Sequence, residues 1–208
     1  REETMGDKNV SAIRLILGLI VLFELVYCFW WMPIDNMKAL IVEEQACVAR
    51  VFGDDDTNVI YERADNIYRA LVIDSGLRKA LVEKKIREDA FLARQQVYAQ
   101  QRGNATLHYF YLMIARLSHL ITWLPFFAVL LTLAVLDGLY MREIKKTNFD
   151  WVSPVRARYF SRMTNFAFLL LFMDIASPFG FSVYIIPAIC LSAVLFISLT
   201  TRNIQKRI

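Results

Sequence analysis

Long apolar runs alternate with polar stretches along this chain, and the apolar runs are long enough to cross a membrane. Residues 11–31 form the first run and residues 107–136 form the second. Residues 163–201 form a third stretch about twice as long as one span, which the turn sequence SPFGFSV interrupts at residues 177–183. Because about 20 apolar residues cross the hydrocarbon core as a helix, the pattern predicts four spans, of which the last two form a hairpin.

The polar segment between the first two spans, residues 33–106, has the pattern of solvent-exposed helices. It carries 11 Lys and Arg against 12 Asp and Glu, with apolar residues at helical spacing between them. We expect its helices at residues 39–52, 59–73 and 76–101. Asp56 or Thr57 is expected to cap the second helix, and Ser75 the third. The predicted fold class is therefore all-α, a polytopic membrane protein with four transmembrane helices and a helical extracytoplasmic insert.

The composition supports a membrane protein and argues against an enzyme. The chain is 57% hydrophobic with a mean hydropathy of +0.39, whereas soluble domains are nearer half apolar. The three Cys lack metal-binding spacing, the two His do not flank a Glu at ligand spacing, and no Gly-rich phosphate loop occurs. A Cys28–Cys47 disulfide stays open, provided that both residues face an oxidising compartment. We therefore expect no catalytic residues, no metal and no cofactor.

The distribution of basic residues predicts how the chain crosses the membrane. Residues 137–162 carry six bases against three acids, and residues 202–208 add three more bases. Because short loops rich in Lys and Arg stay in the cytoplasm, both termini and the 137–162 loop are predicted to be cytoplasmic. The bases near the membrane are also expected to contact anionic lipids.

The predicted organisation follows from the spans and their orientation. It comprises a cytoplasmic N-terminus with the first span at residues 1–32, the outer helical insert at 33–106, the second span at 107–136, the basic cytoplasmic loop at 137–162, the hairpin of the third and fourth spans at 163–201, and a cytoplasmic tail at 202–208.

Four ionisable residues lie at membrane depth in the predicted spans, where charge is costly. Glu24, Arg116, His119 and Asp174 come from three helices and converge on a similar depth in the outer half of the bundle. The structural interpretation is a Glu24–Arg116 or Asp174–Arg116 pair that holds the bundle together. The alternatives are a proton or ion relay through Glu24, His119 and Asp174, and pairing of one of these groups with another subunit.

The basic loop resembles a known family. The motif DGLYMREIKK at residues 137–146, followed by SPVRARYFSR at residues 153–162, resembles the loop of the integrating conjugative element membrane proteins. Some members carry a His after the turn, which this sequence lacks there, so any role of that His does not transfer. The resemblance implies a multi-pass protein of the bacterial inner membrane, with the insert in the periplasm, that serves a conjugative type IV secretion system.

The resemblance also implies the partners. Such a protein would act as an accessory or scaffold subunit in a hetero-oligomer and would bind the membrane part of the coupling ATPase or other secretion subunits. The residues expected to make the cytoplasmic partner contact are Asp137, Gly138, Arg142, Lys145, Lys146, Arg156 and Arg158. Few aromatic residues are interleaved with these bases, so we do not expect direct nucleic-acid contact. The rival hypothesis is a small subunit that moves protons or cations in isolation.

Overall fold

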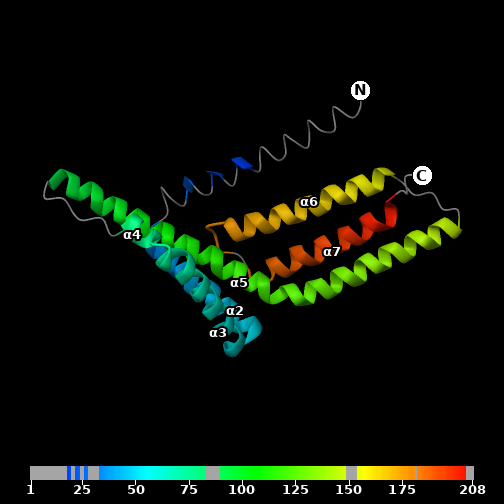
Figure 1. The fold of residues 1–208 in the computed structure, drawn as a ribbon, viewed down its shortest axis with the longest axis horizontal. Coiled ribbons are helices and arrows are strands. Elements are labelled where there is room, and N and C mark those ends of the chain that lie inside the picture. The colour runs from blue at the N-terminus through cyan, green and yellow to red at the C-terminus, as the bar shows by residue number, and fades with distance from the viewer. Residues whose placement is uncertain are drawn as a thin grey trace, which may run out of the picture. The chain divides into compact units, whose positions relative to one another are not determined.

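The computed structural model describes residues 18–19, 22–23, 26–27, 33–82, 90–148, 154–180 and 182–204. The elements in these ranges are helices, and no strand occurs among them, so the all-α prediction is confirmed. They are α2 (Ile34–Phe52), α3 (Asp54–Tyr68), the π-helix η1 (Arg69–Asp74), α4 (Leu77–Val82), α5 (Ala90–Thr147), α6 (Pro154–Ala176) and α7 (Ile185–Asn203), as Figure 1 shows.

The chain divides into two compact units. The first contains Arg1–Ser118 and the short segment Ala176–Gly180, and the second contains His119–Ile175 and Phe181–Ile208. The long helix α5 contributes its N-terminal part to the first unit and its C-terminal part to the second.

The first unit packs the insert helices around the N-terminal part of α5. Helix α2 contacts α3, and both α3 and α4 contact η1. Met37 of α2 is buried against Tyr109 of α5, with Met113 beside them. The insert therefore obtains its core from α5, because short helices with narrow apolar stripes bury too little surface among themselves.

The turn between α2 and α3 differs from the predicted capping. Gly53 has a φ of +83°, a left-handed conformation that reverses the chain within one residue. Helix α3 therefore starts at Asp54 without a side-chain cap, and the Thr57 hydroxyl donates to the Gly53 carbonyl at 2.7 Å. The expectation that Asp56 or Thr57 caps this helix was wrong. The first turn of α3 instead contains Asp54, Asp55 and Asp56, and the helix dipole favours negative charge there.

The boundary drawn at residue 107 between the insert and the second span does not coincide with a break in the helix. Helix α5 runs without interruption from Ala90 to Thr147, and the predicted helix 76–101 includes α4 and the start of α5. Ser75 accepts a 3.4 Å hydrogen bond from the backbone N–H of Leu77 at the start of α4. The predicted loop at 137–162 is also largely helical, because α5 continues to Thr147 and α6 begins at Pro154.

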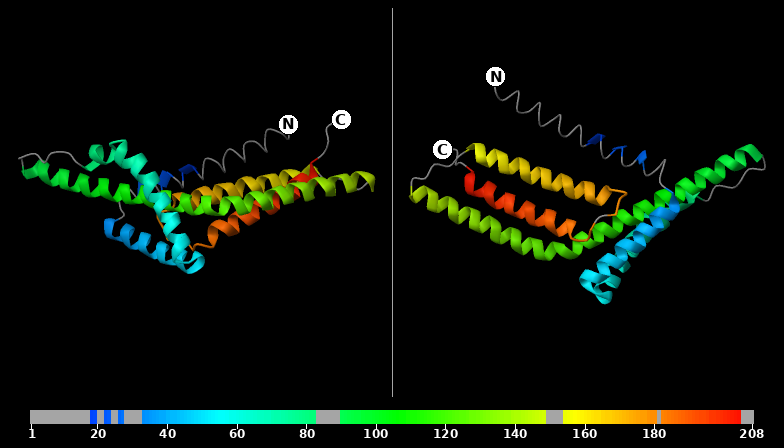
Figure 2. Two further views of the ribbon diagram at one scale, coloured as in Figure 1. Left: turned by 60° about the horizontal axis from the view of Figure 1, so that its bottom comes forward. Right: turned by 180° about the vertical axis from the view of Figure 1, so that it is seen from behind.

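Among the described residues, two helical stretches are long and apolar enough to cross a membrane, Val97–Lys145 and Ile185–Asn203. Only 6% and 11% of their most apolar windows are buried, whereas the core helix of a soluble protein would be mostly covered. The predicted first span lies mainly outside the described residues, so the count of four spans stays a prediction. In the second unit, α6, α7 and the C-terminal part of α5 lie side by side (Figures 1 and 2).

Candidate functional site

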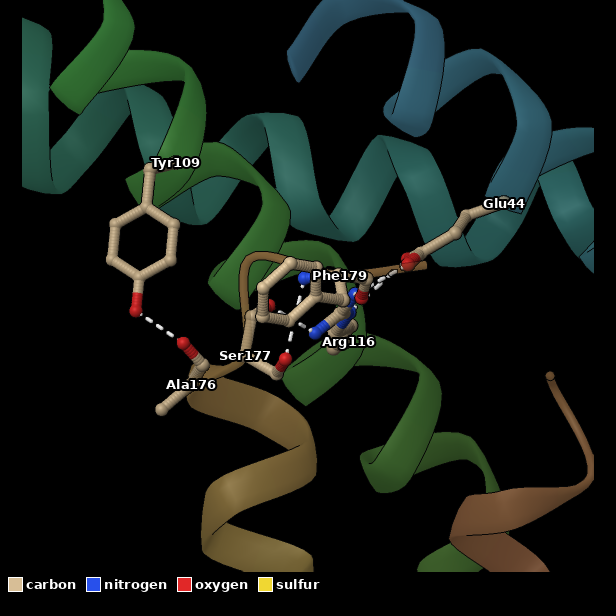
Figure 3. A network of polar contacts seen from close by, with 6 residues as sticks. All are labelled: Glu44, Tyr109, Arg116, Ala176, Ser177 and Phe179. Atoms are coloured by element: carbon tan, nitrogen blue, oxygen red, sulfur yellow. Dashed lines mark hydrogen bonds and ion pairs between the residues drawn. The ribbon is translucent and has the colours of Figure 1, made fainter. Parts of the chain in front are cut away.

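The best-defined polar centre of the first unit is the side chain of Arg116, which is 5% exposed. Its Nε donates to Oε2 of Glu44 at 3.1 Å, and its Nη2 forms an ion pair with Glu44 Oε1. Arg116 comes from α5 and Glu44 from α2, so this two-point contact joins the insert to the long helix (Figure 3). Paired N–H groups on one carboxylate give the strongest class of protein ion pair.

The same guanidinium also holds the segment that follows α6. Arg116 Nη1 donates to the Ser177 carbonyl and Nη2 to the Phe179 carbonyl, each at 2.6 Å. The Tyr109 hydroxyl donates to the Ala176 carbonyl one position earlier (Figure 3). The Ala176 and Ser177 carbonyls belong to buried residues and need such donors, because water cannot reach them. We refer to Glu44, Tyr109, Arg116 and the segment Ala176–Gly180 as the arginine clamp.

A second contact ties α3 to α5 next to the arginine clamp. The Ser118 hydroxyl donates to the Ile60 carbonyl at 2.7 Å, and Arg63 Nη1 donates to the Ser118 carbonyl at 3.4 Å. Tyr61 is buried on the same helix, and burial raises the pKa of its phenol, with the negative charge of Glu44 adding to the effect. These contacts fix the register of α3 on α5, because each pairs one particular side chain with one particular carbonyl.

The structure adds a partner for Arg116 that the sequence analysis did not identify. Arg116 had been expected to pair with Glu24 or Asp174, and Glu44 was counted among the solvated charges of the insert. The spacing along α2 could have indicated that Glu44 faces inward. Glu44 follows Met37 by seven positions and precedes Val48 by four, and both of these residues are buried. Three residues at that spacing share one helix face.

The other residues predicted to lie at membrane depth are Glu24, His119 and Asp174. Glu24 lies outside the described residues. Asp174 and His119 are both buried and belong to the second unit, where the Trp123 indole N–H donates to His119 Nε2 at 3.2 Å. The predicted pairing of Asp174 and the alternative relay both stay predictions.

In the second unit, Gly138 marks the closest approach of α5 to α7. A Cβ atom on Gly138 would lie 2.3 Å from Thr201 Oγ1, 2.8 Å from Thr201 Cβ and 3.0 Å from the Ser198 carbonyl oxygen. Only glycine fits at this position, because each of these separations is shorter than or at the lower limit of a normal contact. The Asp-Gly pair in the motif is therefore a helix-packing feature.

Longer polar contacts also join α5 to α7 on either side of Gly138, and we call this line of contacts the seam. The Ser198 hydroxyl donates to Asp137 Oδ2 at 3.5 Å, and Lys145 Nζ lies 3.4 Å from Asn203 Oδ1 and 3.5 Å from the Arg202 carbonyl. The side chain of Lys146 is outside the described part. Three of the residues predicted to bind a partner, Asp137, Gly138 and Lys145, thus also make contacts within the chain.

Bases from three helices collect at one end of the second unit. Figures 1 and 2 show the end of α5, the start of α6 and the end of α7 near one another. The described residues there include Arg142, Lys145, Arg156, Arg158, Arg162 and Arg202, against Asp137 and Glu143. We call these six bases the basic end. Arg156, Arg158 and Arg162 are exposed, while Arg142, Lys145 and Arg202 are half-buried.

An apolar cavity of about 420 Å³ lies between α5, α6 and α7. Its lining includes small residues from each helix, Ala128, Ala167 and Ala193, which leave space that larger side chains would fill. Among the described residues, no group of His, Cys, Asp and Glu is arranged to hold a metal ion.

Residues 33–207 match the family model described as IncC plasmid conjugative DNA transfer protein DtrJ-like. Because the match covers most of the 208 residues, the chain belongs to the DtrJ-like family and takes part in conjugative DNA transfer. The prediction of a conjugative-transfer protein is confirmed, while its integrating-element and membrane parts stay predictions. No curated protein and no solved structure matches the chain.

Proposed function

We propose that this member of the DtrJ-like family is an accessory subunit of a conjugative type IV secretion system, anchored in the bacterial inner membrane and bound to the membrane part of the coupling ATPase. In this role it is a scaffold in a hetero-oligomer and acts without catalysis, metal or cofactor. The observation that carries the proposal is the basic end of this chain, which lies beside two long, exposed apolar helices in a member of a DNA-transfer family.

Membrane anchoring is supported by the exposed apolar surface of α5. Leu124, Val129 and Leu133 are each more than half exposed, and such side chains on a long helix are stabilised by lipid rather than by water. The excess of bases at the end of α5 and the start of α6 favours the cytoplasmic side for this end. The proposed arrangement has four spans, the insert outside and both termini inside.

The seam at Gly138 supports a binding role for the basic end. The close approach of α5 to α7 at Gly138 keeps Arg142 and Arg202 on neighbouring helices at defined positions. Pre-positioned charges bind an acidic surface more tightly than charges on a flexible loop, because less conformational entropy is lost on binding. An acidic face of the coupling ATPase is the partner that we propose, because complementary charge increases the rate and the specificity of association.

The test is co-purification from donor cells that carry the complete transfer system. We would tag the chain, reverse two exposed charges as Arg156→Glu with Arg158→Glu, and quantify the coupling ATPase recovered in mild detergent. The matched control reverses Arg78 and Lys79, two exposed bases of α4 that lie outside the basic end. We expect at least a tenfold loss of ATPase in the first variant and less than a twofold change in the control.

Membrane topology must be checked in both variants, because bases also orient the chain. Equal recovery of the ATPase from the variant and the wild type, with topology preserved, would refute the proposed contact. If the purified chain alone moved protons into liposomes and recovered no partner, the rival translocation function would replace it.

A further inference from the structure

The first unit contains a hollow of about 460 Å³ that none of the contacts described above occupies. Its walls come from three helices: Lys38, Ile41 and Val42 of α2, Tyr68 at the end of α3, and His108 and Tyr111 of α5. The hollow is separate from the basic end, which belongs to the second unit. Its occupant can therefore be considered independently of the cytoplasmic contact.

Two of the walls are fixed by contacts within the unit. The rings of Tyr68 and Tyr111 meet edge to face, with centroids 5.5 Å apart and an interplanar angle of 83°, a favoured geometry for aromatic pairs. His108 Nδ1 lies 2.8 Å from the Asn104 carbonyl. Since a carbonyl only accepts, Nδ1 carries the proton, and in the neutral ring Nε2 is an acceptor.

The chemistry of the walls is mixed in a way that selects one kind of ligand. Ile41 and Val42 supply aliphatic surface, and the Val42 side chain is 66% exposed. Lys38 also lines the hollow and is exposed, and no ion pair of Lys38 occurs among the described residues. Aliphatic walls with an exposed cation among them favour an apolar group that has a carboxylate beside it.

The position of the hollow along α5 favours a protein ligand over a lipid. His108 and Tyr111 precede the most apolar run of α5, residues 120–136, by nine or more positions. Their neighbourhood is polar, because the Asn104 carbonyl lies 2.8 Å from His108 Nδ1 and Lys38 borders the same hollow. Acyl chains avoid such polar surroundings, whereas peptide segments form hydrogen bonds with them.

We propose that this hollow binds a short segment of a partner protein in which an Asp or Glu lies next to a bulky apolar residue. The apolar side chain packs on Ile41, Val42 and the Tyr68 ring, the carboxylate pairs with Lys38, and a backbone N–H of the segment donates to His108 Nε2. The site joins the outer insert to a second component of the transfer machinery, distinct from the cytoplasmic one.

The experiment places a photo-crosslinking residue, p-benzoyl-phenylalanine, at Val42 in mating donor cells. The matched control position is Val59, which is 54% exposed on α3 and does not line the hollow. We expect the Val42 probe to crosslink one protein, at a peptide that has an acidic residue within three positions of a bulky apolar one. The Val59 probe should not label that peptide.

Two further measurements decide whether the crosslink reports the proposed site. Lys38→Glu should reduce the Val42 crosslink at least fivefold, Lys38→Arg should retain it, and the exposed control Lys79→Glu should leave it unchanged. A synthetic peptide with the captured sequence should bind the purified full chain, and replacing its acidic residue by the amide should weaken binding at least tenfold. Crosslinking only to lipid or to a second copy, equal labelling from Val59, or indifference to Lys38→Glu would each overturn the proposal.

Discussion

Replacing Gly138 by alanine would force α5 and α7 apart. The new Cβ would lie 2.8 Å from Thr201 Cβ, and the helices must separate by about 0.6 Å there to reach an ordinary contact of 3.4 Å. Rotating the Thr201 side chain does not relieve this contact, because its Cβ stays in place. Rotation would also break the hydrogen bonds from its hydroxyl to the Ile197 and Ser198 carbonyls, at 2.7 and 2.9 Å.

The magnitude follows from two opposing effects. Overpacking of this kind costs about 1–3 kcal/mol, whereas changing glycine to alanine inside a helix gains about 1 kcal/mol. Gly18→Ala is the matched control, because nothing lies within 4 Å of a Cβ at that helical position. The free energy of unfolding of Gly138→Ala should therefore fall about 1–3 kcal/mol below that of Gly18→Ala.

The assay is SDS-induced unfolding in mixed micelles, followed by far-ultraviolet circular dichroism. Thr201→Gly removes the clashing atoms, so in a double-mutant cycle it should recover much of the loss caused by Gly138→Ala. If Gly138→Ala is as stable as Gly18→Ala, or if the two changes at the seam are additive, the helices do not touch at Gly138 and the reasoning fails.

Three further predictions concern the first unit and use the same unfolding assay. Arg116→Gln should lower the free energy of unfolding by about 3–5 kcal/mol, because Glu44, whose side chain is only 12% exposed, is left without its cation, and Glu44→Gln in the same chain should restore part of the loss. Tyr109→Phe should lower it by about 1–3 kcal/mol by removing the donor to the Ala176 carbonyl; an unchanged midpoint would contradict that bond. Because burial raises the pKa of the Tyr61 phenol above its ordinary 10.0, the unfolded state ionises first and stability should fall above about pH 10, and Tyr61→Phe should flatten that fall.

The sequence alone was enough to predict the helical class and the place of the main apolar helices. Apolar runs long enough to cross a bilayer, with few Gly and Pro, leave few alternatives to long helices. The DGLYMREIKK motif also pointed to conjugative transfer, and the family match agrees. These features are local, because each depends on the side chains of one continuous segment.

The helix boundaries were harder to predict, because they depend on backbone conformation at single residues. The left-handed Gly53 lets α3 start at Asp54, earlier than the predicted residue 59, and α5 continues through both predicted boundaries because no residue between Ala90 and Thr147 stops it. Pro125 lies inside that helix without ending it.

Only the tertiary structure decided which residues contact each other within the chain. From the sequence, Glu44 resembles the solvated charges around it. Its pairing with Arg116 arises because α2 packs on α5 with the face that carries Glu44 turned inward. Gly138 appeared to be part of a cytoplasmic contact motif, and its contact with Thr201, 63 positions away, exists only because α7 returns along α5. Periodicity shows which face of a helix is apolar, but the residue opposite a given side chain depends on how two distant segments are placed in space.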